Sequence, residues 1–400
     1  MIQNADFVII GAGIVGLTVA LELRKRHKTD SIVIIEKESS VGLHASGRNS
    51  GVLHSGVYYG NDTIKAKVCS SGSKKMQEFA DEHSINYRKS GKVIIATSEA
   101  DLLIIDKLLV NARNNNISVE RLDEFDIRKI EPYSNPYQYG LYSPDTAVID
   151  SYSVVEKLFS ILQDKKVEFK LNSSLLKVND QKNTILTSKE EISFGYLYSC
   201  AGANADRVAK LFKRGLDYTM IPFKGIYYKL DPRKNHLVNS NIYPTPDVNL
   251  PFLGVHLTKV INGDIYVGPT AIPAFGRENY GILKGLKLSE AAGISFELLN
   301  MYLKNVENFR SLVHSETRKY IKPWFLELAQ RLVPSLQSED LVSSNKVGIR
   351  PQLVNIKTKS IEMDYIIEKT ENSTHVLNSI SPAFTSSFSF AEFIINCSEE

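Results

Sequence analysis

The chain has 400 residues, of which 43% are hydrophobic and 23% are charged. These proportions are those of an ordinary globular protein, and the length allows two domains with a large buried core. The 48 basic residues are balanced by 45 acidic ones, so the net charge is only +3. Because no excess of positive charge stands out, we expect no nucleic-acid partner.

The cysteines and the N-terminus indicate the compartment. Cys69, Cys200 and Cys397 lie far apart in the sequence and form neither a metal-ligand spacing nor a disulfide framework, so we expect no metal site. The first six residues lack the features of a secretory signal. The apolar stretch over 7–23 contains three glycines and Glu22, which disfavours a membrane span. We expect a cytoplasmic protein and leave peripheral membrane contact open.

The N-terminal segment predicts a β-α-β unit. Residues 7–10 form a short β-branched and aromatic run, and residues 14–23 carry apolar side chains at helical spacing. A second buried strand over 31–35 ends at Glu36. This unit is the building block of parallel sheets.

Further elements follow in chain order. Helices are expected over 73–83, 101–114, 289–306 and 324–332, and strands over 92–96, 196–200, 225–230 and 264–267. Residues 167–171 and 175–178 are predicted to be two strands paired with each other. A strand over 375–377, a loop with Pro382 and a helix over 384–396 close the chain, with hydroxyl side chains suited to a helix start.

The expected fold class is therefore α/β. A Rossmann-like domain with a mainly parallel sheet is assigned to residues 1–85, 145–212 and 346–400. A second, α+β domain on a mixed or antiparallel sheet is assigned to residues 86–144 and 213–345. The first domain is discontinuous because strand and helix signals of its kind recur at the C-terminal end.

Residues 11–16, GAGIVG, carry the first chemical signal, and Glu36 follows Gly16 by twenty residues. Gly11 makes a tight turn, Gly13 lets the backbone approach a pyrophosphate, and Gly16 allows close packing of the helix on the strand. The helix N-terminus attracts phosphates, and Glu36 can accept hydrogen bonds from a ribose diol. The pattern predicts dinucleotide binding but does not choose between NAD and FAD.

A long loop of small residues over 42–59, GLHASGRNSGVLHSGVYY, follows the second strand and is expected to wrap a ligand. It resembles the cofactor loop of the D-amino-acid oxidase-like flavoenzymes. Its part RNSGVLHSGVYY is similar to the L-2-hydroxyglutarate dehydrogenases and oxidases. The likeness runs from near residue 5 to near 396 and includes PFLGVHLT, GPTAI, GIRPQ, SCAGANAD and SPAFTSS, which begin at 251, 268, 348, 199 and 381.

The resemblance implies non-covalent FAD as the cofactor. It assigns FAD contacts to three regions: the glycine turn with the end of the second strand, the long loop, and the two C-terminal motifs. The expected residues are Gly11, Gly13, Gly16, Glu36, Lys37, Ser46, Arg48, Asn49, Ser50, Gly51, Ala201, Gly202, Pro382, Phe384, Thr385 and Ser386. The terminal helix would direct its amides at the flavin.

The resemblance also implies a reaction, the oxidation of a 2-hydroxy acid, L-2-hydroxyglutarate above all, to a 2-oxo acid by hydride transfer to flavin N5. Such a step needs a base with a pKa near neutrality, which histidine supplies. His54 in the loop is favoured, with His256 as its rival. Arg350 is expected to clamp a carboxylate, unless it only joins two domains through an ion pair.

Lys224 and Arg277 are weaker carboxylate-binding candidates, and Tyr59 is expected to line the pocket. Two alternatives remain. One is an amino-acid or secondary-amine oxidase, because the same flavin geometry oxidises C–N bonds. The other is a non-catalytic flavin-binding protein. Thr270 and Ile380 favour it, because both differ from the residues that the resemblance leads us to expect there. The electron acceptor, oxygen or a quinone, is left open.

Overall fold

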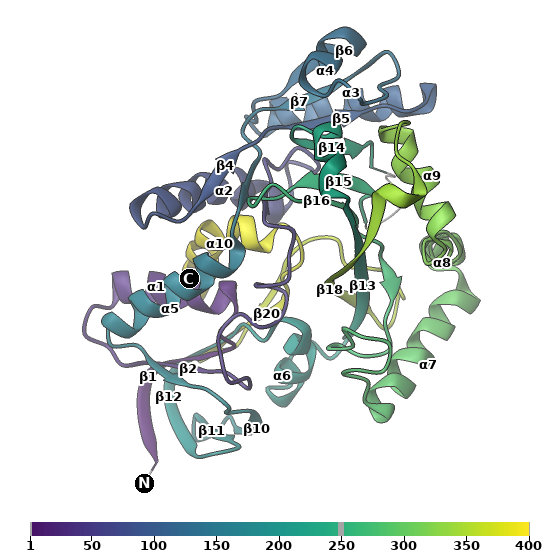
Figure 1. Cartoon of the computed structure of the whole chain (residues 1–400). Coiled ribbons are helices and arrows are strands. Elements are labelled where there is room, and N and C mark those ends of the chain that lie inside the picture. The colour runs from purple at the N-terminus through teal and green to yellow at the C-terminus, as the bar shows by residue number, and fades with distance from the viewer. Residues whose placement is uncertain (1, 247–251, 400) are drawn as a thin grey trace.

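The computed structural model describes residues 2–246 and 252–399. Two large sheets dominate it (Figure 1), and a small antiparallel sheet of β3 (Val52–Leu53), β8 (Ala147–Ile149) and β4 (Tyr87–Lys89) accompanies them. Pro251, the first residue of one motif quoted above, lies outside the described residues. Within the described ranges, no helix is both long and apolar enough to cross a membrane.

The first large sheet has a core of five parallel strands. In spatial order these are β9 (Glu168–Lys170), β2 (Ile32–Ile35), β1 (Gln3–Ile10), β12 (Glu191–Ser199) and β20 (Ser373–Asn378). Three strands are added in antiparallel fashion, namely β10 (Leu175–Asn179), β11 (Thr184–Thr187) and β19 (Ile366–Lys369). The carboxyl ends of the parallel strands share one edge of the sheet.

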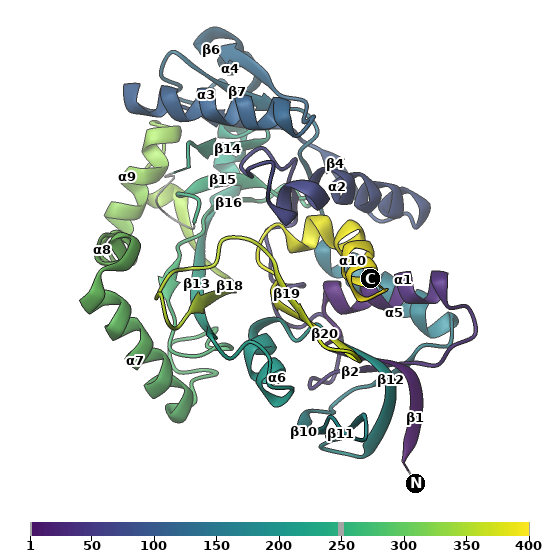
Figure 2. The same cartoon turned by 180° about the vertical axis from the view of Figure 1, so that it is seen from behind.

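Side chains alternate across this sheet, as strand geometry requires. Ile9 of β1 packs with buried residues of four helices, α1 (Ile14–Arg26), α2 (Ile64–Glu82), α5 (Ser151–Asp164) and α10 (Ala383–Glu399). Its neighbours Val8 and Ile10 face the other side, toward Phe212 just after α6 (Ala205–Leu211). Figure 2 shows β19, β20 and α6 from that side. The sheet is thus buried on both faces.

The second sheet has nine strands and is mostly antiparallel. Its order is β17 (Ile272–Pro273), β13 (Tyr218–Leu230), β16 (Ile265–Gly268), β15 (His256–Lys259), β14 (Asn241–Pro244), β5 (Lys92–Ile95), β7 (Tyr139–Ser143) and β6 (Glu120–Asp123), while β18 (Leu341–Asn355) also pairs with β13. Helix α9 (Lys322–Leu332) packs on the face of Val93. Helix α3 (Glu99–Asn114) packs on the face of Ile94. The remaining helices are α4 (Glu124–Ile130), α7 (Leu288–Lys304) and α8 (Phe309–Arg318).

The α/β fold class with one mainly parallel and one mixed sheet is confirmed, as is the N-terminal β-α-β unit. Helix α2 begins at Ile64, nine residues before the predicted start at 73. Its cap is Thr63, whose hydroxyl accepts a hydrogen bond from the Ala66 amide. The first turns are rich in lysine and serine, so their apolar period is weak.

The predicted pairing of strands over 167–171 and 175–178 is wrong. Strand β9 pairs with β2, whereas β10 pairs with β11. Between β9 and β10 the amides of Asn172 and Ser173 bind the carbonyls of Glu38 and Glu36, which holds the chain beside the end of β2. Apolar content marked both strands, but it carries no information about which strand is the partner.

Candidate active site

The glycine turn brings α1 against the carboxyl ends of β1 and β12. Gly11 has a φ of +103°, and a Cβ on it would lie 2.4 Å from the carbonyl oxygen of Cys200. A Cβ on Gly16 would lie 2.0 Å from the Gly11 carbonyl oxygen. Glu36 follows β2 directly, and its carboxylate accepts a hydrogen bond from the Ala12 amide (2.8 Å). Glycine is therefore required at both positions for helix and strands to meet.

Open space lies at the same sheet edge. The Ser46 hydroxyl accepts a hydrogen bond from the Ile14 amide in the first turn of α1 (2.9 Å), and a Cβ on Gly13 would lie 3.1 Å from that hydroxyl. Ala201 and Gly202 follow the neighbouring parallel strand β12. Gly202 has a φ of +51°, and no heavy atom lies within 4 Å of the position of its absent Cβ. Helix amides, a hydroxyl and an open glycine fit the phosphates of a dinucleotide.

The rest of the long loop is held by its own polar groups. Arg48 Nε donates to a loop carbonyl (2.9 Å), the Asn49 side chain accepts from the Gly51 amide (2.8 Å), and the Ser50 hydroxyl accepts from a backbone amide two residues later (3.3 Å). Gly51 has a φ of +75°, and a Cβ on it would lie 2.5 Å from the carbonyl oxygen at the end of β8. These hydrogen bonds and the tight packing at Gly51 therefore hold the loop in one conformation.

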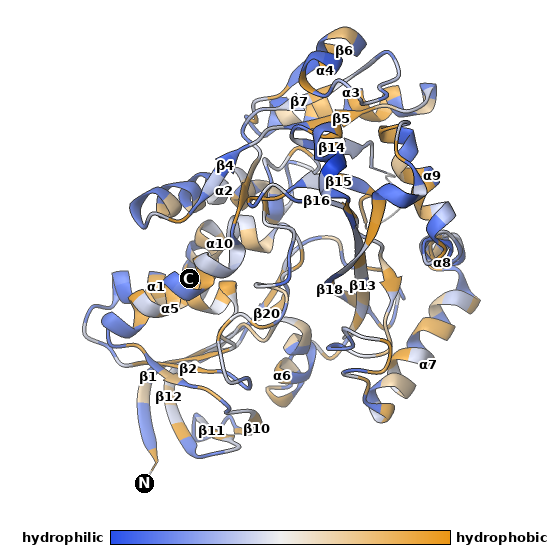
Figure 3. Ribbon diagram, in the orientation of Figure 1, coloured by the Kyte–Doolittle hydropathy of each residue, from blue (hydrophilic) through white to orange (hydrophobic). Residues whose placement is uncertain are grey.

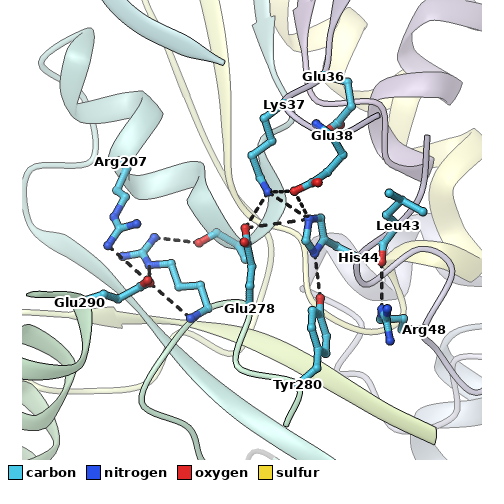
Figure 4. A network of polar contacts seen from close by, with 12 residues as sticks. Glu36, Lys37, Glu38, Leu43, His44, Arg48, Arg207, Glu278, Tyr280 and Glu290 are labelled. Carbon is cyan, nitrogen blue, oxygen red and sulfur yellow. Dashed lines mark hydrogen bonds and ion pairs between the residues drawn. The ribbon is translucent and has the colours of Figure 1, made fainter. Parts of the chain in front are cut away.

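A polar network joins the loop to residues 278–280 of the other part of the chain (Figure 4). The Lys37 ammonium contacts Glu38, Glu278 (2.7 Å) and His44 Nε2 (3.1 Å), and His44 Nδ1 lies 2.8 Å from the Tyr280 hydroxyl. Glu38, His44 and Glu278 lie close enough together to hold a metal ion. The Lys37 ammonium already supplies a positive charge to these three side chains.

The start of α10 contacts the long loop through hydrogen bonds. Thr385 Oγ1 accepts a hydrogen bond from the His54 amide (3.2 Å) and donates to a loop carbonyl (3.3 Å). The Ser386 hydroxyl donates to the Pro382 carbonyl (3.1 Å), and Phe384 is partly buried beside them. The first turn of α10 therefore fixes the backbone of His54.

Polar groups without partners gather around His54. Its Nδ1 is buried with no hydrogen-bond partner among the described residues, and so is Arg350 Nε. The guanidinium of Arg350 lies 4.9 Å from the ring centre of Phe252. His256 Nδ1 lies 2.8 Å from the Gly254 carbonyl oxygen, a distance that suits donation to that oxygen and leaves Nε2 as the acceptor. Buried groups left unpaired in a folded chain point to a missing polar ligand.

The electrostatics keep both imidazoles neutral. Burial lowers the pKa of His54 to about 3, and the charges of Lys92, His256 and Arg350 act in the same direction. Burial lowers the pKa of His256 to about 4 against the effect of its backbone hydrogen bond. Burial also lowers the pKa of Arg350, to about 10, which leaves this residue positively charged at neutral pH. Both imidazoles are therefore unprotonated at neutral pH and can accept a proton, but their pKa values lie well below the near-neutral value predicted from the sequence for the base.

The structure places Lys224 elsewhere. In the pairing of β13 with β18, Phe223 lies opposite Arg350 and Lys224 lies opposite Ile349. Neighbouring residues on a strand point to opposite faces, so Lys224 points away from the face of Arg350. Its amine donates to Asn279 Oδ1 (3.1 Å) and to a backbone carbonyl (2.7 Å).

Arg277 is also engaged elsewhere. Its buried guanidinium pairs with Asp206 and with Glu290 (3.2 Å), and it donates to the Ala203 carbonyl (2.7 Å). Tyr59, in contrast, lies beside the cluster, where burial raises the pKa of its phenol and the Arg350 charge opposes that effect. Tyr59 therefore remains a candidate for lining the substrate pocket, whereas the Arg277 guanidinium is already engaged in ion pairs within the chain.

One buried residue of the cluster, Lys92, was not predicted. It begins β5 and is fully buried, and its amine has no hydrogen-bond partner among the described residues. The signal available in the sequence was a lysine that opens the apolar run KVII. Sequence reasoning treated that run only as a strand, because nothing local shows that its first residue faces a site.

A parallel sheet whose strand ends carry a glycine turn and an acid, facing a second sheet with buried polar groups, defines a dinucleotide-binding oxidoreductase of two-sheet architecture. The family model described as FAD dependent oxidoreductase matches residues 6–396. The chain belongs to this family, which confirms FAD as the cofactor.

Named relatives agree with the family. The chain is 35% identical to the L-2-hydroxyglutarate dehydrogenase of Indibacter alkaliphilus, over 97% of both chains. It is 33% identical to the enzyme of the same name from Escherichia coli K12, over 98% of this chain and 92% of the relative. Among solved structures, the FAD-bound L-α-glycerophosphate oxidase of Mycoplasma pneumoniae superposes with a TM-score of 0.79 at 20% identity, covering 100% of this chain and 96% of the other. That likeness shows the fold alone.

Proposed function

We propose that the enzyme oxidises L-2-hydroxyglutarate to 2-oxoglutarate. The observation that carries the proposal is the cluster of unpaired polar groups at His54 and Arg350, a neutral base beside an unpaired cation. The names of the full-length relatives supply the hydroxy acid. An amine oxidation would use the same flavin, so the substrate is what the experiment must decide.

The chain's own residues bind and orient the reactants. Gly11, Gly13, Gly16, Ser46 and Gly202 would hold FAD without a covalent bond, and Glu36 would bind its adenosine ribose. The other proposed cofactor-binding residues lie after β2, in the long loop, after β12 and at the start of α10, namely Lys37, Arg48, Asn49, Ser50, Gly51, Ala201, Pro382, Phe384, Thr385 and Ser386. When bound, FAD accepts a hydride from the substrate α-carbon.

The catalytic roles follow from geometry and charge. Arg350 would bind the α-carboxylate, with Tyr59 lining the same pocket. His54 would take the hydroxyl proton, because the α10 turn fixes its backbone and its imidazole is neutral. His256 is the rival base, since its Nδ1 contact with a carbonyl leaves Nε2 to accept a proton.

Anaerobic flavin reduction tests the proposal. Purified holoenzyme is mixed with L-2-hydroxyglutarate, its D-enantiomer, sarcosine and a set of amino acids, and the flavin absorbance is followed. We expect rapid bleaching by the L-hydroxy acid alone. Bleaching by amines alone would favour the amine-oxidase reading, and a yellow protein reduced by nothing would favour the non-catalytic one.

We also propose the division into a cofactor-binding part (1–85, 145–212, 346–400) and a substrate-binding part (86–144, 213–345). The parallel strands β1, β2, β9, β12 and β20 all fall in the first set of ranges. The boundary at 345 falls inside β18, a strand of the second sheet. Arg350 follows that boundary, which suits a residue that acts where the two parts meet.

We further propose peripheral contact with an anionic bilayer, with oxygen or a quinone as the electron acceptor. The support is a set of exposed apolar side chains on α7, a helix that carries hydrophobic segments in Figure 3. Leu288, Phe296, Leu299 and Leu303 are 82%, 64%, 55% and 61% exposed. Their spacing puts them along one side of the helix as an apolar stripe.

Charge complements this stripe. Lys284, Lys287 and Lys304 are exposed beside it and form no ion pair with the described residues, whereas Glu290 and Glu297 are already paired. Unpaired cations flanking apolar side chains suit anionic lipid headgroups. Phe296→Ser with Leu299→Ser should abolish sedimentation with phosphatidylglycerol vesicles, while Leu103→Ser on α3 should not. A wild type that instead forms a dimer through this stripe would contradict the proposal.

A further inference from the structure

Lys92 is a buried cation for which the described residues supply no counter-charge. The side chain is 0% exposed, and its amine has neither a hydrogen bond nor an ion pair among the described residues. Burying an unpaired ammonium is costly, and buried lysines are almost always paired. Burial lowers the pKa of Lys92 to about 7. The amine is therefore held where a negative charge would stabilise it.

Its neighbours are aromatic. The amine lies 4.6 Å from the ring centre of Tyr58 and 5.1 Å from that of Tyr243. Cation–π contact recovers less free energy than the desolvation of an ammonium group costs. The Tyr58 hydroxyl is itself buried without a partner. The Tyr58 hydroxyl donor and the Lys92 amine therefore belong to neighbouring side chains, and neither has an acceptor among the described residues.

The neighbouring Cys69 thiol and Lys65 amine do not supply the missing negative charge at Lys92. The Cys69 thiol, whose charge would favour the ammonium, has its pKa raised to about 12 by burial and so stays neutral. Lys65, another buried lysine of the region, donates to the Met363 carbonyl and is not an orphan. Lys92 differs from it in having no acceptor within the ranges 2–246 and 252–399.

The sheet register points Lys92 into the active site. Ile94 of β5 lies opposite Tyr243 of β14, and Lys92 is on the same face as Ile94. The Tyr243 ring in turn stacks on His256 at 4.0 Å. Tyr58 comes from the loop that carries His54. The lysine therefore belongs to the same group of side chains as both histidines.

Two cations without an ion pair among the described residues, on different strands, lower the pKa of His54. Lys92 lies on β5 and Arg350 on β18, and the positive charge of each lowers the pKa of the His54 imidazole. A monocarboxylate can neutralise one of them. A dicarboxylate whose reacting carbon lies at His54 can neutralise both.

We propose that Lys92 and the Tyr58 hydroxyl form the subsite for the distal carboxylate of a dicarboxylic 2-hydroxy acid, while Arg350 binds the carboxylate next to the reacting carbon. This inference rests on the proposed function and extends it, because it names the residues that select a dicarboxylate. Without the distal carboxylate, Lys92 stays unpaired and binding loses a charge-assisted hydrogen bond.

The test compares two substrates of equal chain length, L-2-hydroxyglutarate and L-2-hydroxyvalerate, on FAD-loaded wild type and Lys92→Met. We expect Lys92→Met to lower kcat/KM for the dicarboxylate by about 100-fold and to leave the monocarboxylate within about 3-fold. Tyr58→Phe should act on the dicarboxylate alone, by about 10-fold. An equal loss on both substrates would overturn the assignment.

Binding without turnover provides a second measurement. Glutarate and butyrate are titrated into holoenzyme while the flavin spectrum is recorded, and wild type should bind glutarate far more tightly. Lys92→Met should remove that preference, whereas Lys65→Met, the matched control, should keep it. A wild type without the preference contradicts the subsite. A wild type that prefers glutarate but is reduced by no hydroxy acid contradicts only the proposed reaction.

Discussion

Two buried arginines of this protein differ in what surrounds them. Arg277 forms ion pairs with Asp206 and Glu290, whereas Arg350 forms no ion pair among the described residues and lies against the ring of Phe252. The first completes a contact between α6 and the segment before α7, and we propose that the second binds a ligand. The comparison teaches that residue type and burial do not separate structural from functional cations. The presence of an internal anion does.

The largest expected effect comes from the proposed base beside Arg350. His54→Asn should slow anaerobic flavin reduction by L-2-hydroxyglutarate by about 10²–10⁴-fold, because a positioned base is lost. FAD content should stay unchanged, since the hydrogen bond that joins His54 to α10 is made by its backbone amide and survives the substitution. His256→Asn is the matched comparison, and a larger loss there would transfer the role of base to His256.

Arg277→Met tests the structural side. It leaves Asp206 buried without its cation and leaves Glu290 with only the more exposed Arg207, so the free energy of unfolding should fall by about 3–5 kcal/mol. Chemical denaturation of the holoenzyme measures this. The KM of the fraction that stays folded should hardly change. A raised KM with normal stability would return Arg277 to the substrate site.

Arg350→Lys keeps the charge but removes the planar fork of donors. We expect kcat/KM to fall by about 10–100-fold, because a lysine cannot clamp a carboxylate through two parallel hydrogen bonds. Unfolding should be nearly unaffected, since Arg350 has no internal ion pair to lose. A large loss of stability would show that this arginine joins the two parts of the chain instead.

The smallest effect is a shift in pH dependence. The pKa of His54 is lowered to about 3 and that of His256 to about 4, so either base stays unprotonated far below neutrality. The rate of flavin reduction should therefore hold down to about pH 5, where an ordinary histidine with a pKa of about 6.5 would already be protonated. Burial lowers both pKa values most, and the charges of Lys92, Arg350 and Lys319 act in the same direction.

The same shifts affect stability. Because the folded-state pKa values lie below the unfolded one, the unfolded chain binds more protons between about pH 4 and 6.5, and stability should fall as the pH falls through this window. Denaturation at several pH values checks the sign. A stability that rises on acidification would show that these imidazoles gain, and do not lose, protons on folding.

Much of the cofactor region could be predicted from the sequence, because its chemistry is local. The turn at Gly11 to Gly16 and the acid at Glu36 are fixed by short-range sterics, and their spacing survives in any chain that forms a β-α-β unit. The structure adds that Gly11 and Gly16 have no room for a Cβ. It does not test the role of Glu36 toward a ribose, which stays a prediction.

The substrate region was decided by tertiary structure. Arg277, Lys224 and Arg350 looked alike as isolated cations, and only the pairing of β13 with β18 and the position of Asp206 distinguished them. Lys92 was not recognised at all, because its role depends on Tyr58 and Tyr243, which lie 34 residues before and 151 after it. Local sequence determines turns and periodicity, whereas the pairing of buried charges depends on which distant strands become neighbours.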